Sequence, residues 1–239
     1  MADTADLWTR PWDDPWLLHF THLDNLAEIA RTGLLSDKGR RPDVHECGQP
    51  SIKERRRKRA VPVPPGGAVA DYAPFYFAAR SPMLRSILGG KVERYDSDQT
   101  HLIYLVTRLS KVVNAGLAWV ATDRNAVLNT AKFTSDASKL ADHVDWEIMK
   151  ARYWGNTADD GFRRERRMAE LLVYEAVPWD VFTHLAVCCG DRAVEVREQL
   201  AGARPIPRVL VKPDWYFEVP DGCPCQGLWS WGGGELDDR

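Results

Sequence analysis

A single carboxylate separates a basic run from an apolar run late in the sequence. Glu170 follows the arginine-rich residues 163–167 and precedes the strand-forming residues 171–174. Because side chains alternate along a strand, Glu170 shares one face with Leu172 and Tyr174. Burying a carboxylate without a partner is costly. Glu170 therefore either stays at a solvated strand end, which the pattern alone favours, or lines a cleft that binds a cationic or hydroxylated ligand.

Other polar side chains are expected at strand ends. His19 and Thr21 close an apolar segment, Tyr76 closes an aromatic one, and Arg56 lies in a basic segment between them. Alone, His19 is typical of a core histidine that has found a partner. Together with Glu170 these types suit cleavage of a glycosidic bond: a carboxylate stabilises an oxocarbenium-like sugar, arginine holds phosphates, an aromatic ring stacks, and His and Thr orient hydroxyls.

Length and composition indicate one globular domain. The chain has 239 residues, of which 44% are hydrophobic and 28% charged, with a formal net charge of -2. We predict an N-terminal arm over 1–15, a domain over 16–217 and a C-terminal tail over 218–239. The net charge does not indicate any class of partner. The basic patches at 53–59 and 163–167, however, are typical of a site for a phosphate-rich ligand.

Cysteine usage and hydropathy indicate where the protein works. Five cysteines, two of them adjacent, do not form a disulfide framework. No apolar run has the length of a membrane span, and the acidic, Trp-rich beginning does not have the pattern of a signal peptide. We therefore expect an intracellular, reduced, cytoplasmic protein that does not interact with membranes.

The sequence lacks the known motifs for metal and nucleotide binding. His45-Glu46-Cys47 and Cys223-Pro224-Cys225 lack the spacing of a tetrahedral zinc site, so we predict no metal. Neither a phosphate-binding loop, nor a dinucleotide fingerprint, nor a nucleophile elbow occurs.

Periodicity and turn residues predict short strands mixed with helices. The expected strands cover 16–22, 72–77, 101–107, 118–122, 170–176, 183–188 and 208–211. The expected helices cover 26–31, ending at Gly33, then 51–59, 81–88, 123–133, 145–154 and 193–200. This distribution favours an α+β fold over a doubly wound parallel sheet.

Six motifs occur in an order that resembles a known family. They are His19-Phe20-Thr21-His22-x-Asp24-Asn25-Leu26, Ile52-Lys53-Glu54-Arg55-Arg56, Pro74-Phe75-Tyr76-Phe77-x-x-Arg80-Ser81-Pro82-Met83-Leu84, Val144-Asp145-Trp146-Glu147, Ala151-Arg152-Tyr153-Trp154 and Arg167-x-Ala169-Glu170-x-Leu172-Val173. They resemble the DarT family, the DNA ADP-ribosyltransferase toxins of bacterial toxin–antitoxin pairs. Residues 212–216 also look like the C-terminal strand of that family.

The resemblance implies an ADP-ribosyltransferase fold, with helices and a split, mostly antiparallel sheet around an NAD⁺ cleft. It implies transfer of ADP-ribose from NAD⁺ to a base of single-stranded DNA, most often thymidine, with a guanosine-modifying branch as the alternative. It further implies a monomer whose partner is an antitoxin with a macrodomain that removes ADP-ribose. Chemistry alone leaves RNA or protein open as acceptors.

The family's residues that act on NAD⁺ have matches in this chain. By resemblance, His19, Thr21 and the nearby Asn25 bind the ribose and nicotinamide side, and Tyr76 stacks on the nicotinamide. Glu170 matches the catalytic carboxylate.

Arginines and one methionine are expected on the DNA side. Arg56 matches the residue that holds the NAD⁺ phosphates and acts on the target base, with its neighbour Arg55 as the alternative. Arg80 and Met83 match residues that meet the DNA. We assign Arg55 and Arg57 to DNA binding as well, since a basic groove beside aromatic residues suits a single strand.

One stretch departs from the family pattern and one other class of function stays open. Where some relatives carry a histidine, this chain has Thr122-Asp123-Arg124-Asn125, which bears on the identity of the target base. The alternative function is a non-catalytic module that binds single-stranded nucleic acid. Glu170 distinguishes the two, because a carboxylate beside a basic groove repels phosphates and gains a pure binder nothing.

Overall fold

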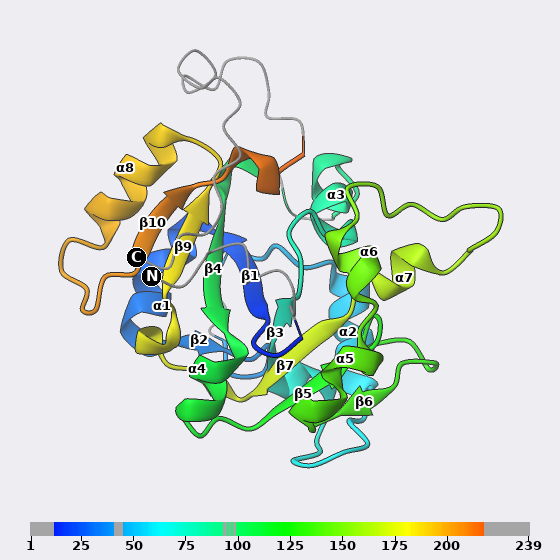
Figure 1. Cartoon of the computed structure of the whole chain (residues 1–239). Coiled ribbons are helices and arrows are strands. Elements are labelled where there is room, and N and C mark those ends of the chain that lie inside the picture. Colours follow the sequence, from blue (N-terminus) through cyan, green and yellow to red (C-terminus); the bar gives the residue numbers. More distant parts are fainter. Residues whose placement is uncertain (1–11, 41–44, 93–94, 96, 98, 218–239) are drawn as a thin grey trace, which may run out of the picture.

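A twisted eight-stranded sheet forms the centre of the molecule (Figure 1). The computed structural model describes residues 12–40, 45–92, 95, 97 and 99–217. The strand order is β10-β9-β4-β1-β3-β7-β5-β6, and every neighbouring pair except β9 and β10 is antiparallel. The strands are β1 (Trp16–His22), β3 (Tyr72–Tyr76), β4 (Leu102–Arg108), β5 (Trp119–Thr122), β6 (Phe133–Thr134), β7 (Glu170–Tyr174), β9 (His184–Val187) and β10 (Arg208–Val211). The predicted α+β class is confirmed.

The sheet is split between β1 and β3. These two strands share a single registered pair, Leu18 with Tyr76. In contrast, β1 pairs with β4 over its whole length, and β3 pairs with β7 from Tyr72 opposite Tyr174 to Tyr76 opposite Glu170. The divergence of β1 from β3 agrees with the split sheet that the sequence predicted.

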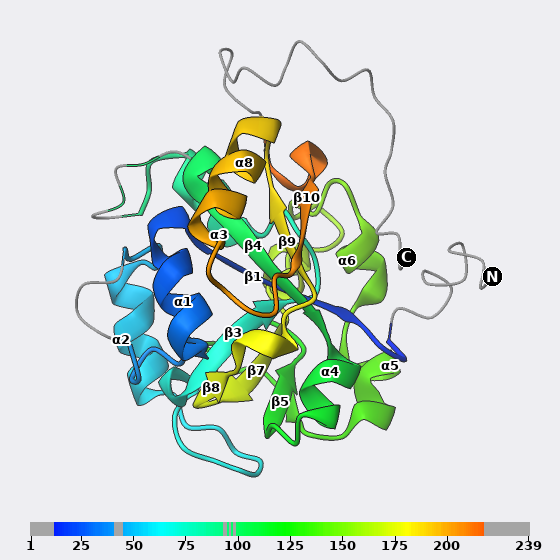
Figure 2. The ribbon, with the colours of Figure 1, turned by 90° about the vertical axis from the view of Figure 1, so that its left-hand side faces the viewer.

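Helices lie on both sides of the strands. Figure 2 shows α1 and α2 to one side and α4, α5 and α6 to the other. The α-helices are α1 (Leu26–Thr32), α2 (Pro50–Lys58), α3 (Pro82–Leu88), α4 (Leu109–Asn114), α5 (Leu140–His143), α6 (Trp146–Lys150), α7 (Arg163–Arg166) and α8 (Gly190–Gln199). A small second sheet pairs β2 (Leu34–Leu35) with β8 (Ala176–Val177). Among the described residues, no helix is both long enough and apolar enough to cross a membrane.

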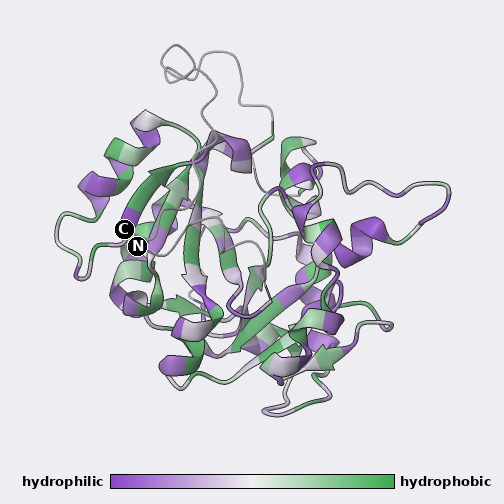
Figure 3. Cartoon of the chain, viewed as in Figure 1, coloured by the Kyte–Doolittle hydropathy of each residue, from purple (hydrophilic) through white to green (hydrophobic). Residues whose placement is uncertain are grey.

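The alternation predicted for the strand at Glu170 is confirmed. Leu171 and Val173 pack into the largest apolar cluster, whereas Leu172 packs into a separate one with Tyr72. Figure 3 colours the central strands largely as hydrophobic and α7 as hydrophilic. Strand β7 is therefore buried on both faces, and Glu170, its first residue, is buried as well.

Helix α1 ends where the sequence predicted. Gly33 has a φ of 80°, and its N–H bonds to the carbonyl of Ile29 at 2.8 Å. A Cβ at Gly33 would lie 2.6 Å from the carbonyl oxygen of Val177, which belongs to β8. Glycine is therefore required here by both conformation and space.

The predicted helix over 123–133 is wrong. Residues 123–132 form turns, and β6 follows. The Asp123 carboxylate accepts the N–H of Lys132 at 2.8 Å, and the Asn125 side chain accepts the N–H of Val127 at 3.1 Å. Such side-chain bonds to the backbone compete with helical hydrogen bonds.

Four other helical and strand assignments change. The helix expected over 145–154 is α6 alone, which ends at Lys150. The strand expected over 170–176 divides into β7 and β8 at Glu175, whose φ is 59°. The strand suggested for 212–216 is wrong, since Pro213–Trp215 form one turn of 3₁₀ helix. Helix α8 begins at Gly190, earlier than the predicted 193.

The described part of the predicted N-terminal arm contacts the domain. Asp14 accepts hydrogen bonds from the N–H of Ser110 at 2.7 Å and from its hydroxyl at 2.8 Å. The Trp12 ring lies 6.4 Å from that of Trp146. Residues 12–15 therefore pack on the domain, while the remaining arm residues and the predicted 218–239 tail lie outside the described residues.

Replacing Gly33 with alanine should destabilise the protein more than the same change at another glycine with positive φ. Gly33→Ala should lower the free energy of unfolding by more than about 2 kcal/mol, from strain and the clash with Val177. Gly116 has a φ of 68° with nothing near its Cβ direction, so Gly116→Ala should cost about 1 kcal/mol. Urea unfolding measures both. Equal losses would contradict the close approach of α1 to β8.

Candidate active site

A buried ion pair joins α2 to the start of β7. Arg56 Nη1 donates to Glu170 Oε2 at 2.8 Å. The Glu170 side chain is 2% exposed and that of Arg56 is 13% exposed. Within the described part of the chain, the other terminal nitrogen of Arg56, Nη2, is buried without a hydrogen-bond partner. The pair thus satisfies the carboxylate and leaves one arm of the guanidinium fork available to a ligand.

Helix α2 is oriented so that Arg56, not Arg55, faces the sheet. Lys53, three residues before Arg56 and on the same face, forms ion pairs with Asp37 and Glu46. Arg55 is exposed. The ion pairs of Lys53 therefore anchor α2. Because Arg56 follows Lys53 by three residues, Arg56 and not Arg55 contacts Glu170.

The backbone of Glu170 is held by β5. Thr122 Oγ1 accepts the N–H of Glu170 at 3.1 Å and donates to the carbonyl of Arg124 at 2.7 Å. The stretch that departs from the family pattern therefore begins at a residue bonded to Glu170. Arg124 itself pairs with Asp123 at 3.1 Å.

Arg167 is a positioning residue to which the sequence reasoning gave no role. Its buried guanidinium donates to the carbonyls of Ile148 at 2.6 Å, Met149 at 2.7 Å and Ala79 at 2.6 Å. Burial lowers the pKa of Arg167 to about 10. Arg167, just before Glu170, thus joins three segments: the end of α6, the turn before α3 and the approach to β7. Its acceptors are main-chain carbonyls, which leave no signature in a sequence.

Tyr76 lies beside Glu170 on the adjacent strand. The two residues are register partners of β3 and β7. The Tyr76 ring stacks on Phe20, with centroids 6.2 Å apart, and its hydroxyl donates to Met83 Sδ at 3.6 Å. Burial, with a further contribution from Glu170, raises the pKa of Tyr76. The structure therefore brings Glu170, Arg56, Tyr76 and Met83 together.

His19 bridges the split in the sheet. Its Nδ1 lies 2.7 Å from the carbonyl oxygen of Pro74 on β3. Because a carbonyl only accepts, Nδ1 carries the proton and Nε2 keeps its lone pair. Burial lowers the pKa of His19 to about 3, with contributions from Arg40 and Arg56. His19 is therefore a neutral acceptor near the guanidinium of Arg56.

Thr21 and Asn25 border a pocket between β1, α1 and β2. Asn25 Nδ2 donates to Thr21 Oγ1 at 2.9 Å and to the carbonyl of His45 at 2.9 Å, and Asn25 Oδ1 accepts the N–H of His45 at 2.8 Å. Asn25 thus fixes residue 45 as well as Thr21. The lining residues are Thr21, Asn25, Glu28, Ile29, Thr32, Gly33, Leu34, Leu35 and Arg40.

The residues assigned to DNA divide into two groups. Arg80, with a φ of 54°, stacks its guanidinium over the Phe217 ring at 4.9 Å, on the turn that leads to Met83. On α2, Arg57 is half exposed and lies 3.7 Å from Asp37 and 3.6 Å from Glu54. The structure therefore places Arg80 and Met83 on the Tyr76 side, and Arg55 and Arg57 at exposed positions of α2.

This chain is similar to known proteins in sequence and in fold. The family model described as "ssDNA thymidine ADP-ribosyltransferase, DarT" matches residues 18–217. A DNA ADP-ribosyl transferase of Thermus sp. (strain 2.9) is 41% identical over 213 residues, covering 87% of this chain and 99% of the relative. The structure of Thermus sp. 2.9 DarT in complex with ADP-ribosylated ssDNA matches with a TM-score of 0.77 at 39% identity, over 85% of this chain and 96% of that chain. The NAD⁺ complex of the same protein matches with a TM-score of 0.74 at 38% identity, over 85% and 98%. The chain belongs to the DarT family.

Membership of the DarT family makes the chain an ADP-ribosyltransferase that acts on DNA. The family's activity is modification of thymidine in single-stranded DNA, which agrees with the predicted target. The predicted ADP-ribose donor, NAD⁺, agrees with the solved structure of Thermus sp. 2.9 DarT in complex with NAD⁺. Neither the guanosine alternative nor the non-catalytic module receives support. The roles of individual residues remain predictions.

Acid should weaken the fold through His19. Its pKa is about 3 in the folded protein against an ordinary 6.5, so below pH 6.5 the unfolded chain takes up a proton that the folded chain refuses. The contribution to stability is complete above pH 6.5. It falls between pH 6.5 and 3 by at most about 1.4 kcal/mol per pH unit.

Urea unfolding of the wild type and of His19→Gln at several pH values measures this effect. Gln keeps a donor for Pro74 but does not titrate, so the variant should lose less stability than the wild type between pH 6.5 and 4. The same pH slope in both proteins would contradict a buried neutral His19.

Proposed function

We propose that Glu170 and Arg56 form the reaction centre for transfer of ADP-ribose from NAD⁺ to thymidine. The observation that supports this is their buried ion pair, in which Arg56 Nη2 has no partner among the described residues. Glu170 accepts a hydrogen bond from a hydroxyl of the nicotinamide ribose. It also stabilises the positive charge that develops on the sugar as the glycosidic bond breaks. Arg56 holds a diphosphate oxygen with its unpaired arm.

The NAD⁺ molecule lies along the split in the sheet. His19 offers Nε2 to a ribose hydroxyl, since Nδ1 is committed to Pro74. Thr21 and Asn25 border the pocket that takes part of the dinucleotide, where Arg40 adds a positive charge. Tyr76 stacks on the nicotinamide.

The DNA strand approaches from the side of Arg80 and Met83. Arg80 contacts the strand, and Met83 packs beside Tyr76 near the target base. The exposed Arg55 and Arg57 of α2 add attraction for phosphates.

The transfer breaks one bond and forms another. The bond from the ribose anomeric carbon to the nicotinamide nitrogen breaks, and nicotinamide leaves as a neutral molecule. The same carbon bonds to the imide nitrogen of thymine, whose proton leaves to solvent. Arg56 is always charged, so it acts by stabilising negative charge on the base and not by removing the proton.

The cellular setting is proposed from the resemblance to DarT toxins. We propose a domain over 16–217 that acts as a monomeric toxin in the cytoplasm, where NAD⁺ and exposed single strands occur together. An antitoxin with a macrodomain, which removes the ADP-ribose, is the expected partner from the resemblance of the motifs to DarT toxins.

Incubation with NAD⁺ and matched acceptors tests the proposed function. The acceptors are a single-stranded oligonucleotide with one thymidine, the same strand with guanosine or cytidine there, an RNA of matching sequence and a bulk protein. Mass analysis should find ADP-ribose on the thymidine strand alone. Modification of the guanosine strand, RNA or protein in place of the thymidine strand would overturn the proposed target.

Removing the charge of Glu170 should abolish most of the activity. Glu170→Gln keeps the size of the side chain but cannot stabilise an oxocarbenium-like sugar, so single-turnover ADP-ribosylation should slow by about 10²–10³ or more. Circular dichroism should show a folded variant. Wild-type turnover by Glu170→Gln would remove Glu170 from the reaction centre.

Arg56 should not tolerate lysine, whereas Arg55 should. Lysine keeps the charge of Arg56 but loses the planar fork that reaches Glu170 and a phosphate together. Arg56→Lys should therefore slow transfer about as strongly as Arg56→Ala, and Arg55→Lys, exposed on the same helix, is the matched control. Initial rates with the thymidine strand measure this. A selective loss in Arg55→Lys would move the assignment by one residue.

A further inference from the structure

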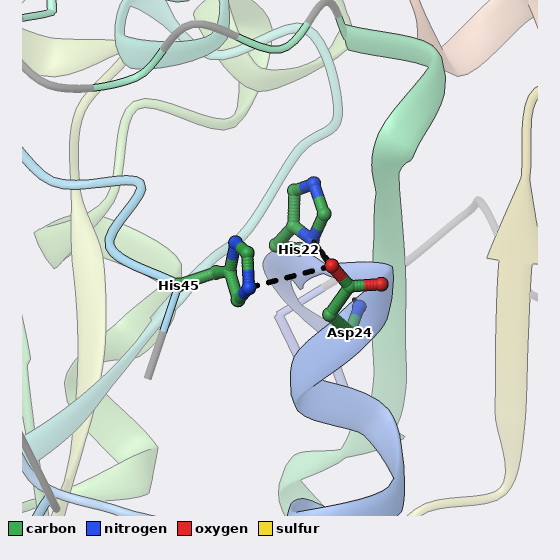
Figure 4. Close-up of side chains that lie close together, drawn as sticks. All are labelled: His22, Asp24 and His45. Carbon is green, nitrogen blue, oxygen red and sulfur yellow. Dashed lines mark hydrogen bonds and ion pairs between the residues drawn. The ribbon is translucent and has the colours of Figure 1, made fainter. Parts of the chain in front are cut away.

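A second cluster of reactive side chains lies at the junction of β1 and α1, outside the proposed reaction centre. His22 ends β1, Asp24 follows in the short 3₁₀ turn, and His45 comes from the segment that leads to α2 (Figure 4). Asp24 Oδ2 lies 3.5 Å from His22 Nδ1 and 3.4 Å from His45 Nε2. All three ligand atoms lie within 4.8 Å of one another.

The two distances to Asp24 Oδ2 match those between ligands of a tetrahedral metal. Zinc bonds to histidine nitrogen and carboxylate oxygen of about 2.0–2.1 Å place neighbouring ligand atoms about 3.3–3.4 Å apart. Two nitrogens and one oxygen from three residues leave a fourth position for water. We propose that His22, Asp24 and His45 form a binding site for a divalent transition-metal ion, with zinc the best match.

The backbone around the cluster is already fixed. Asn25 bonds both the N–H and the carbonyl of His45, which holds the third ligand opposite the first two. The His22 side chain is 5% exposed, whereas those of Asp24 and His45 are 52% and 56% exposed. A metal ion can therefore enter from solvent without opening the core.

Binding requires two local adjustments. The rings of His22 and His45 lie nearly parallel, at 14° with centroids 4.7 Å apart, while a metal binds in the plane of each ring. The exposed His45 side chain must therefore turn. The metal also replaces the 3.2 Å hydrogen bond from the N–H of Asp24 to His22 Nδ1. The first change involves an exposed side chain, and the second removes the side-chain cap of the 3₁₀ turn Leu23–Asn25.

The ligand types decide which metals fit. Imidazole suits zinc, copper, nickel and iron, whereas calcium and magnesium favour all-oxygen sites. His101 also stacks on His22, with centroids 5.7 Å apart, but its Nε2 lies 2.9 Å from Arg192 Nη2. We therefore leave His101 out of the ligand set.

The metal would brace the NAD⁺ side of the protein without touching the reacting atoms. His45 is bonded through Asn25 to Thr21, and the segment after His45 continues into α2, which carries Arg56. A bound ion would fasten this segment to the end of β1. The site is separate from the residues of the proposed transfer mechanism.

Direct metal binding by the full chain tests the site. After treatment with a chelator and with thiols kept reduced, Zn²⁺ titrated by calorimetry at pH 7 should bind at one site per chain. Co²⁺ in its place should give the visible absorption of tetrahedral cobalt. His45→Ala and Asp24→Asn should each weaken zinc binding by at least about tenfold, and His143→Ala, which removes an imidazole elsewhere, should not.

The cysteines provide the decisive comparison. Zinc also binds thiolates, so Cys223→Ser/Cys225→Ser must keep the affinity of the wild type if the proposed site is correct. Binding that survives in His45→Ala but is lost in the double serine variant would overturn the proposal. So would wild-type protein that binds neither ion.

Discussion

The ion pair of Arg56 and Glu170 is the interaction on which the rest of the site depends. A carboxylate that is 2% exposed costs several kcal/mol unless a partner compensates its charge. Arg56 supplies that partner from a helix 114 residues away in the sequence. The same pairing fixes the position of the carboxylate at the start of β7. In the proposed mechanism, substrate binding adds to a charge arrangement that the fold has already assembled.

The surrounding structure holds the two partners in place from separate directions. Lys53 and Asp37 anchor α2, Thr122 fixes the backbone of Glu170, and Arg167 joins the approach to β7 with the turn before α3. The split between β1 and β3 opens the sheet beside the pair, because the two strands share only one registered position. His19 keeps the strands connected there. The strand ends beside this split supply the polar groups of the site.

The sequence predicted those features that depend on local pattern or on matched motifs. Alternation placed Leu171 and Leu172 on opposite faces, and Gly33 marked the end of α1. Arg56, unlike Arg55, lies three residues after Lys53 and so shares its helix face. This spacing distinguishes the two arginines only once α2 is known to pack on the sheet. The role of Arg167 could not be predicted, because its acceptors are carbonyls. The helix expected over 123–133 failed because Asp123 and Asn125 bond to the backbone. His22 and His45 meet only through the fold, so a search for metal motifs by spacing misses them.

A double-mutant cycle tests most directly whether Arg56 and Glu170 act as one unit. Single-turnover rates of thymidine ADP-ribosylation are measured for the wild type, Glu170→Gln, Arg56→Lys and the double variant. Residues that act together give strongly non-additive losses, so the double variant should be no slower, within about threefold, than the slower single variant. Losses that multiply in the double variant would show that the two residues act independently and would contradict the account.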